Sequence, residues 1–247
     1  MIPPEFAATG LHIAPNGTPP TRFQVLGERS SGTNYVKRLL GRNTPLTPTE
    51  ALGWKHAHPH ALAIPADLVV ICVMRHAVPW ALAMYAKPWH CPPAMQALEF
   101  SDFIRAPWDT VVDRAKYFDM RRGLLGQALQ HDRDPATGRP YADLCALRQG
   151  KLRGLLSYGA RGCSFVLLRM EEAVERPEDV LNRLREGLSL PPATGPLRPV
   201  FKRLGSRFKP AIPDRPMPPA GIGASDLEWM RSRMNMEQES ALGYDYG

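Results

Sequence analysis

Apolar residues in this chain form short unbroken runs as well as runs with helical spacing. The most apolar run, Leu68–Met74, contains seven residues rich in Val and Ile, and Ser164–Leu168 contains a shorter one after its serine. Such runs are typical of strands covered on both faces in a parallel sheet. Phe23–Leu26 predicts another short strand, which Gly27 ends. Three buried strands therefore organise the predicted fold.

Helical spacing of apolar residues predicts helices that alternate with these strands. The first helix covers Ser31–Leu40 and ends at Gly41. A capping box, Ser225–Glu228, predicts a last helix that runs to about Leu242. The other predicted helices are Val78–Ala86, Trp108–His131, Leu144–Ala160 and Pro177–Leu188, with a polar loop over Asp132–Arg139. This alternation indicates an α/β fold with a mostly parallel central sheet flanked by helices.

Two stretches fit no regular element. Residues 1–21 are rich in Pro, Gly and Thr and predict an N-terminal arm or loop. Residues 191–219 hold nine prolines and six Lys or Arg against one acid, Asp214, and predict a basic extended loop. Because one α/β domain of this length is ordinary, we expect a single domain over residues 1–247.

Composition narrows the class of protein. With 44% hydrophobic and 22% charged residues, the chain of 247 residues is globular rather than disordered. No apolar run approaches the roughly 20 residues of a membrane span, and the start lacks a signal-peptide pattern, so we expect a cytoplasmic protein. Four scattered cysteines predict no disulfide framework, and Cys72 belongs to a predicted core strand. The net charge of +7 favours an anionic partner without identifying it.

The segment Gly27–Asn34, GERSSGTN, has the glycine spacing of a phosphate loop between a strand and a helix. Backbone N–H groups and the helix N-terminus make such a loop an anion site. A nucleotide triphosphatase would continue with Lys and Ser or Thr for the β/γ-phosphates and Mg²⁺, whereas this chain has Thr33 and Asn34. The alternative is a glycine-bounded helix start without a ligand. The hydroxyl groups of Ser30, Ser31 and Thr33 favour the anion site.

Three histidines alternate in Lys55–His60, KHAHPH. On an extended segment the rings of His56, His58 and His60 share one face, as metal ligands do. A neutral His56 is equally suited to act as a general base, with His58 in reserve, and the Lys55 ammonium to stabilise negative charge. The remaining alternative is a polar loop whose histidines cap backbone groups.

Arg75 follows the predicted strand Leu68–Met74 directly. Ligands bind at the carboxyl ends of strands in α/β folds, where an arginine can hold a phosphate with two parallel hydrogen bonds. The alternative for Arg75 is a salt bridge that closes the sheet.

Several segments together resemble the sulfotransferases that use 3′-phosphoadenosine 5′-phosphosulfate (PAPS). Gly27–Tyr35 resembles the loop that binds the 5′-phosphosulfate, and Leu68–Met84 resembles the segment that binds the 3′-phosphate. Trp54-Lys55-His56 stands where the family has a Lys/His catalytic segment. Later segments, SFVLLRMEEAVERPEDVLNRL and the terminal ALGYDYG, extend the resemblance over about residues 23–243.

The resemblance implies a three-layer, P-loop-like α/β fold and a sulfotransferase that moves a sulfuryl group from PAPS to a hydroxyl or amine. PAP is then the product, no metal is needed, and Lys55 and His56 are the catalytic residues. The acceptor is expected to be a small molecule or a glycan. The donor-binding residues that it implies are Arg29, Ser30, Ser31, Gly32, Thr33, Asn34 and Arg75.

Two departures from the family pattern leave alternatives open. Many members have Lys where this chain has Ser30, and Ser where it has Ala83. One alternative is therefore a nucleotide-binding or scaffold protein that has the same fold without catalysis. Another is a metal-dependent hydrolase built on His56, His58 and His60. A nucleic-acid partner is not expected, because it would rest on charge alone without a recognised module.

Overall fold

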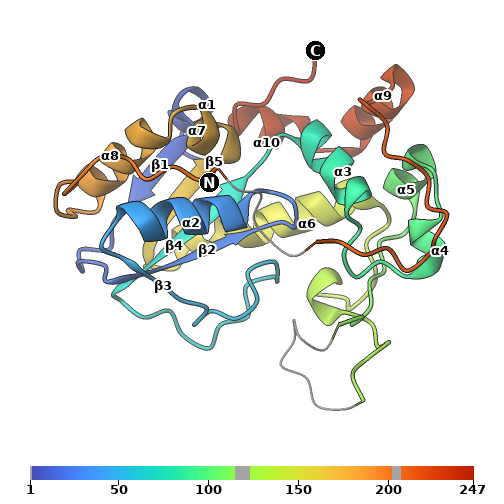
Figure 1. Cartoon of the computed structure of the whole chain (residues 1–247), viewed down its shortest axis with the longest axis horizontal. Coiled ribbons are helices and arrows are strands. Elements are labelled where there is room, and N and C mark those ends of the chain that lie inside the picture. The colour runs from blue at the N-terminus through green and yellow to red at the C-terminus, as the bar shows by residue number, and fades with distance from the viewer. Residues whose placement is uncertain (1, 115–122, 202–206) are drawn as a thin grey trace.

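The computed structural model describes residues 2–114, 123–201 and 207–247. In this part of the chain five strands form one sheet in the order β1-β5-β4-β2-β3 (Figure 1). The strands are β1 (Leu11–Ala14), β2 (Arg22–Gly27), β3 (Thr47–Pro48), β4 (Leu68–Met74) and β5 (Ser164–Arg169). All neighbours pair in parallel except β1, which pairs antiparallel with β5. The fold is thus α/β with a mixed, mostly parallel sheet, as predicted.

Helices cover both faces of this sheet (Figure 1). Every residue of β4 is buried, and alternate residues belong to different hydrophobic clusters. Its odd-numbered residues pack with α2 (Thr33–Asn43) and α8 (Pro177–Gly187). Its even-numbered residues pack with α3 (Ala77–Ala86) and α6 (Leu144–Leu156). This double coverage explains why the β4 sequence is apolar without alternation.

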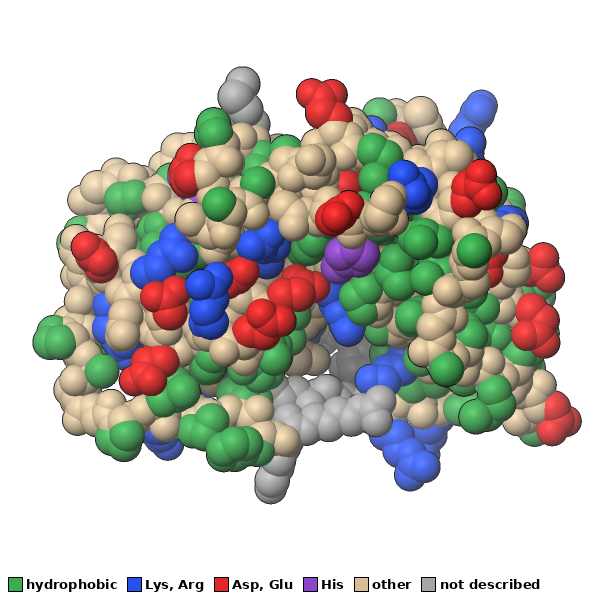
Figure 2. All heavy atoms as spheres, turned by 90° about the horizontal axis from the view of Figure 1, so that it is seen from above, with side chains coloured by type: hydrophobic (Ala, Val, Ile, Leu, Met, Phe, Trp, Pro, Cys, Tyr) green, Lys and Arg blue, Asp and Glu red, His purple; other side chains and the backbone are tan. Residues whose placement is uncertain are grey.

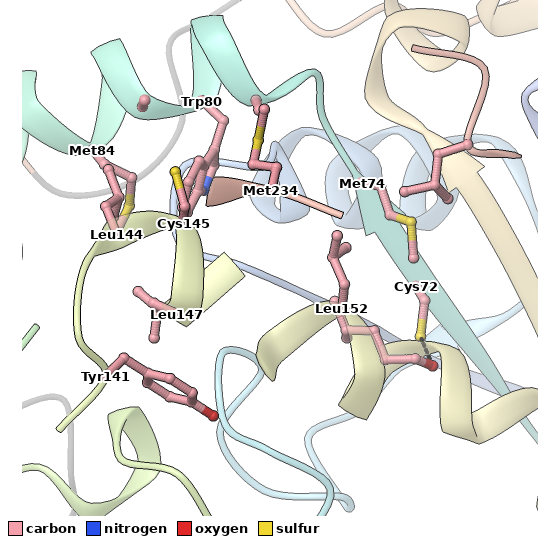
Figure 3. Close-up of a cluster of buried hydrophobic side chains, with 14 of the residues drawn as sticks. Cys72, Met74, Trp80, Met84, Tyr141, Leu144, Cys145, Leu147, Leu152 and Met234 are labelled. Atoms are coloured by element: carbon pink, nitrogen blue, oxygen red, sulfur yellow. Dashed lines mark hydrogen bonds between the residues drawn. The ribbon is translucent and has the colours of Figure 1, made fainter. Parts of the chain in front are cut away.

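The cluster between α3 and α6 is rich in sulfur and aromatic side chains (Figure 3). Trp80 and Met84 project from α3 toward Cys145 and neighbouring residues of α6. Cys72, fully buried as predicted, lies with its Sγ 3.5 Å from the Leu155 carbonyl oxygen. The contact joins the centre of the sheet to the C-terminal turn of α6.

The remaining elements lie around these layers. They are α1 (Phe6–Thr9), α4 (Pro93–Gln96), α5 (Phe100–Arg105), α7 (Met170–Glu175), α9 (Ala224–Arg233) and α10 (Met236–Ala241), with 3₁₀ turns η2 (Gln130–Asp132) and η3 (Ser157–Ala160). Residues 1–21, expected to be an arm or loop, contain α1 and β1, because β1 finds backbone partners along β5. The expected loop of residues 191–219 has no helix or strand over residues 191–201 and 207–219. The rest of that loop lies outside the described residues.

The predicted helix over Trp108–His131 is wrong in its described parts. The Trp108 amide donates to the Tyr141 carbonyl at 2.8 Å, and the Val111 amide donates to the His90 carbonyl at 2.8 Å. These amides therefore pair across the fold and not with a carbonyl one helical turn away. Residues 115–122 of the prediction lie outside the described part of the chain.

The helix ends also differ from the predicted ones. α2 passes Gly41 and ends at Asn43. The expected last helix is broken into α9 and α10, and the Asn235 side chain accepts the Gln238 amide at the start of α10. The predicted capping box is wrong, since α9 begins before Ser225 and has no side-chain cap. No helix in residues 2–114, 123–201 or 207–247 has the length and apolarity that a bilayer crossing requires.

Candidate functional site

The turn between β2 and α2 has the shape of an anion-binding loop. Ser30 and Gly32 have φ angles of 63° and 96°, in the left-handed region. A Cβ at Gly27 would lie 2.7 Å from the Val73 carbonyl oxygen, so only glycine allows β2 to run this close to β4 at the loop's start. The Ser31 hydroxyl donates to the Glu28 carbonyl at 2.7 Å and closes the turn from within.

The outer side of the loop presents donors. Among the described residues, no acceptor contacts the backbone amides of Gly32, Thr33 and Asn34. The first amides of a helix have no intrahelical acceptor, and they carry the positive end of the helix dipole. Together with the hydroxyl groups of Ser30 and Thr33, these amides are suited to an oxyanion.

Lys55 reaches the same helix start from the segment after β3. The Gly27 amide donates to the Lys55 carbonyl at 3.0 Å, which docks this segment beside the end of β2. The Lys55 ammonium donates to Asn34 Oδ1 at 2.5 Å. Burial lowers the pKa of Lys55, and the Lys37 cation lowers it further. A lysine thus lies at the loop although none lies within it.

His56 contacts the other end of the loop. Its Nδ1 is 2.6 Å from the Gly27 carbonyl oxygen, which can only accept, so Nδ1 carries the proton and Nε2 keeps its lone pair. The ring is partly exposed, yet the packing around it and the Lys55 ammonium lower its pKa well below the ordinary value. His56 is therefore neutral at physiological pH and available as a base.

Arg75 also lies at the loop. It follows the end of β4, is half-buried, and donates from Nη1 to the Ser30 carbonyl at 3.0 Å. Burial lowers the pKa of Arg75, while Glu171 opposes this effect. The structure thus brings Arg75, Lys55 and His56 together at the turn over Gly27–Asn34.

Arg29 takes a different direction from the other loop residues. Its side chain is buried, and Nη2 is 2.6 Å from Asp132 Oδ2. Lys151 lies 3.1 Å from the other oxygen of the same carboxylate. Burial opposes ionisation of Asp132, but the Arg29 and Lys151 cations outweigh it and lower its pKa. The ion pair between Arg29 and Asp132 therefore anchors the loop to the protein interior.

A second buried ion network lies beside this one. Fully buried Arg148 contacts Glu28 at 3.0 Å and Glu239 at 2.7 Å, and it also donates to the Arg75 carbonyl at 3.0 Å. Tyr246 donates to Glu239 at 2.6 Å. Burial raises the pKa of Glu28 to about 7, although Arg148 acts in the opposite direction. One arginine thus connects the loop, the end of β4 and α10.

No family model, curated protein or solved structure matches this chain.

Sequence reasoning missed both buried networks. A signal exists for two of their members, because Arg148 and Lys151 lie on the same face of α6 as Leu144 and Leu155. Cations on an apolar helix face require buried anions. That signal does not identify Glu28, Asp132 or Glu239 as the partners, since they come from distant parts of the chain.

The three alternating histidines face different partners. His56 Nδ1 pairs with Gly27, His58 Nε2 lies 3.1 Å from the Tyr141 hydroxyl, and His60 Nδ1 lies 2.8 Å from the His58 carbonyl. Within the described ranges, no group of three or more His, Cys, Asp or Glu side chains is arranged to hold a metal ion. His56 is the member of the trio that contacts the loop.

The C-terminal segment packs beside Arg75. The His76 amide donates to Glu171 at 3.0 Å, and His76 Nε2 donates to the Asp245 carbonyl at 3.0 Å. The His76 ring lies 4.4 Å from the ring of Tyr246. Figure 2 views the molecule from the side of α1, α9 and α10, where basic and acidic side chains lie intermixed around a hollow. The end of β4 is thus bounded by the last residues of the chain.

Proposed function

We propose that this protein is a PAPS-dependent sulfotransferase with a P-loop-like fold, which transfers a sulfuryl group to a hydroxyl or amine and releases PAP. The observation that carries the proposal is that His56 and Arg75 contact the same anion-binding loop, His56 at its first residue and Arg75 near its middle. His56 contacts the Gly27 carbonyl and Arg75 the Ser30 carbonyl. A base and a phosphate-binding arginine on one loop suit a donor that has a reacting end and a second phosphate.

In this proposal the donor's 5′-phosphosulfate lies against the loop. Its oxygens accept from the amides of Gly32, Thr33 and Asn34 and from the hydroxyl groups of Ser30 and Thr33, while Ser31 supports the turn through its bond to the Glu28 carbonyl. The 3′-phosphate binds Arg75, whose guanidinium uses one donor for the Ser30 carbonyl and leaves its others without an acceptor among the described residues. Arg29 supports the loop from below through Asp132.

The transfer requires one base and one cation. The acceptor oxygen or nitrogen attacks sulfur, a new bond to sulfur forms, and the bond between sulfur and the bridging oxygen of the donor breaks. His56 Nε2 takes the acceptor's proton, and the electron pair of the broken bond leaves on PAP. Lys55 stabilises the negative charge that develops on the transferring group. Lys55 supplies from a neighbouring segment the ammonium that the loop lacks at Ser30.

Calorimetric titration of PAP into the metal-free protein tests the donor class, with ATP plus Mg²⁺ titrated in parallel. We expect PAP to bind with micromolar affinity and ATP much more weakly, because the loop lacks the Lys and the Mg²⁺ ligand of nucleotide triphosphatases. Absence of PAP binding would overturn the proposal. Binding of PAP without transfer from labelled PAPS to any acceptor would favour the non-catalytic nucleotide-binding alternative.

The role of His56 is tested by His56→Ala, with His60→Ala as the matched control. His60 belongs to the same segment and does not contact the loop. Loss of a general base is expected to lower the turnover rate about 100-fold or more while PAP affinity stays within about twofold. Equal turnover by wild type and His56→Ala would remove His56 from the mechanism.

A further inference from the structure

A cavity lies away from the phosphate loop, and no residue of Gly27–Asn34 lines it. Its volume is about 330 Å³, within the size range of small-molecule sites. α6 carries Arg148, which contacts the loop residue Glu28, in its first half and is followed by the turn η3 before β5. The cavity lies along the second half of the helix. The lining residues that the argument uses are His58, Pro59, Asp134, Tyr141, Arg153 and Arg161.

Two glycines shape this cavity. A Cβ at Gly150 would lie 2.2 Å from the Tyr141 hydroxyl oxygen, and one at Gly154 would lie 2.9 Å from Pro59 Cδ. The missing side chains let Tyr141 and Pro59 pack directly against α6. This packing therefore fixes the positions of Tyr141 and Pro59, two lining residues, relative to α6.

Two cations line the cavity without an acidic partner. Arg153 and Arg161 flank Ser157 at intervals of four residues, so the three side chains lie along one side of α6 and η3. Arg161 donates to the neutral Ser157 hydroxyl at 3.1 Å and lies over the Tyr158 ring. In the described part of the chain, neither arginine comes within 4.0 Å of a carboxylate oxygen.

The acid in the described lining, Asp134, forms no ion pair with either arginine and balances only one of their two positive charges. Its Oδ1 accepts the amides of Ala136 and Thr137 at 3.0 and 2.9 Å, as the cap of its own turn. These amide hydrogen bonds lower the pKa of Asp134. The Arg153 cation lowers it to a smaller extent, from beyond ion-pair distance. His58 adds no charge, because burial and Lys151 lower its pKa to about 4. The cavity therefore has an excess of positive charge.

We propose that this cavity binds a small organic oxyanion with an apolar body, such as an aryl carboxylate or an aryl phosphate. The guanidinium groups of Arg153 and Arg161 hold the oxyanion, whose two or more oxygens match their planar donors. The ring of Tyr141 and the proline Pro59 contact the apolar part. The proposal does not depend on the assignment of PAPS to the phosphate loop.

The experiment uses ¹⁹F NMR of the full chain with 4-fluorobenzoate, 4-fluorophenyl phosphate and the neutral isostere 4-fluorobenzamide. At least one of the two anions should bind about tenfold or more tightly than the amide, since one charge-assisted hydrogen bond is worth about 1.5–3 kcal/mol. The tighter anion identifies which oxyanion the cavity prefers. Equal binding of anions and amide would overturn the proposal.

Variants place the bound anion. Arg153→Gln combined with Arg161→Gln should remove the preference for the anion, whereas Arg38→Gln combined with Arg231→Gln removes two exposed charges outside the cavity lining and should keep it. An unchanged preference in the first double variant would contradict the assignment. PAP titrated into the same proteins reports separately on the phosphate loop. The cavity variants are expected to bind PAP as the wild type does. If no protein binds PAP, the proposed function fails, but the ¹⁹F comparison of anions and amide still tests the cavity.

Discussion

The two sides of the loop Gly27–Asn34 differ in how completely their polar groups are paired. On the inner side, Glu28 and Arg29 enter buried ion networks with Arg148 and Asp132. On the outer side, the amides at the start of α2 contact no acceptor within the described residues. The paired inner side fixes the loop before any ligand arrives. The outer side is thus preorganised, which lowers the entropy cost of binding an anion.

The inner groups are therefore expected to determine the stability of the fold, and the outer groups the affinity for an anion. Removing an inner group leaves an opposite charge buried and unpaired, which destabilises the fold. Removing an outer group costs little without a ligand, because outer groups are solvated and are engaged only when one binds. The experiments below test this separation, beginning with the largest expected effect.

Arg148→Met is expected to lower the free energy of unfolding by about 3–5 kcal/mol, because Glu28 and Glu239 then lose their buried cation. Urea denaturation followed by circular dichroism measures the loss. Arg153→Met is the matched control, since Arg153 is exposed on the same helix, and it should change the free energy of unfolding by less than about 0.5 kcal/mol. Equal losses in the two variants would show that the network does not stabilise the loop.

Arg75→Ala is expected to weaken PAP binding about tenfold or more while leaving the unfolding midpoint nearly unchanged. The reason is that, within the described part of the chain, the half-buried Arg75 side chain makes one hydrogen bond, to the Ser30 carbonyl, and its other donors are left for the 3′-phosphate. Calorimetry measures the affinity. Arg38→Ala removes an exposed charge from α2 and should keep the affinity within about twofold. Equal PAP affinity in wild type and Arg75→Ala would remove Arg75 from the site.

Acidification should have the smallest effect on the loop. Burial lowers the pKa values of His56, His58, His90 and His131, so between about pH 6.5 and pH 4 the unfolded chain binds protons that the folded chain does not. Stability therefore falls as the pH falls through this window. Glu28 acts in the opposite direction, because its pKa is raised to about 7 and folding favours its protonated form. Because four imidazoles act against one carboxyl, we expect the histidines to dominate the pH dependence.

Thermal melts at pH 7.5 and pH 5 measure the combined effect of the histidines and of Glu28 on stability. The melting temperature is expected to be several degrees lower at pH 5. His58→Gln should make this difference smaller, since glutamine can still accept from the Tyr141 hydroxyl but does not titrate. A melting temperature that is unchanged or higher at pH 5 would contradict the histidine assignment.

Local sequence patterns located the loop in the chain but failed to identify the ion networks on its inner side. The run Leu68–Met74 gave the bounds of β4 correctly, because a strand covered on both faces needs an unbroken apolar run. The glycine spacing likewise located the turn before α2. In contrast, Glu28 and Arg148 are 120 residues apart, and nothing local marks them as partners.

The wrong elements share the same cause. Apolar spacing in Trp108–His131 predicted a helix, but the Trp108 amide pairs with Tyr141, which lies beyond that segment. β1 was missed because a four-residue edge strand carries little pattern of its own and depends on β5. Asp226, expected within a capping box, instead accepts hydrogen bonds from Arg105 and Ser101. Each of these contacts depends on tertiary proximity rather than on neighbouring residues.

The pairing of Arg148 with both Glu28 and Glu239 also has a consequence for biosynthesis. A ribosome makes Glu28 first, Arg148 after a further 120 residues, and Glu239 after another 91. A nascent chain that extends only to α8 therefore contains Glu28 and Arg148 but lacks Glu239, the second carboxylate that Arg148 contacts. Closing such long-range contacts is slow compared with forming a local turn. The loop thus reaches its final rigidity only after α10 has left the exit tunnel and docked.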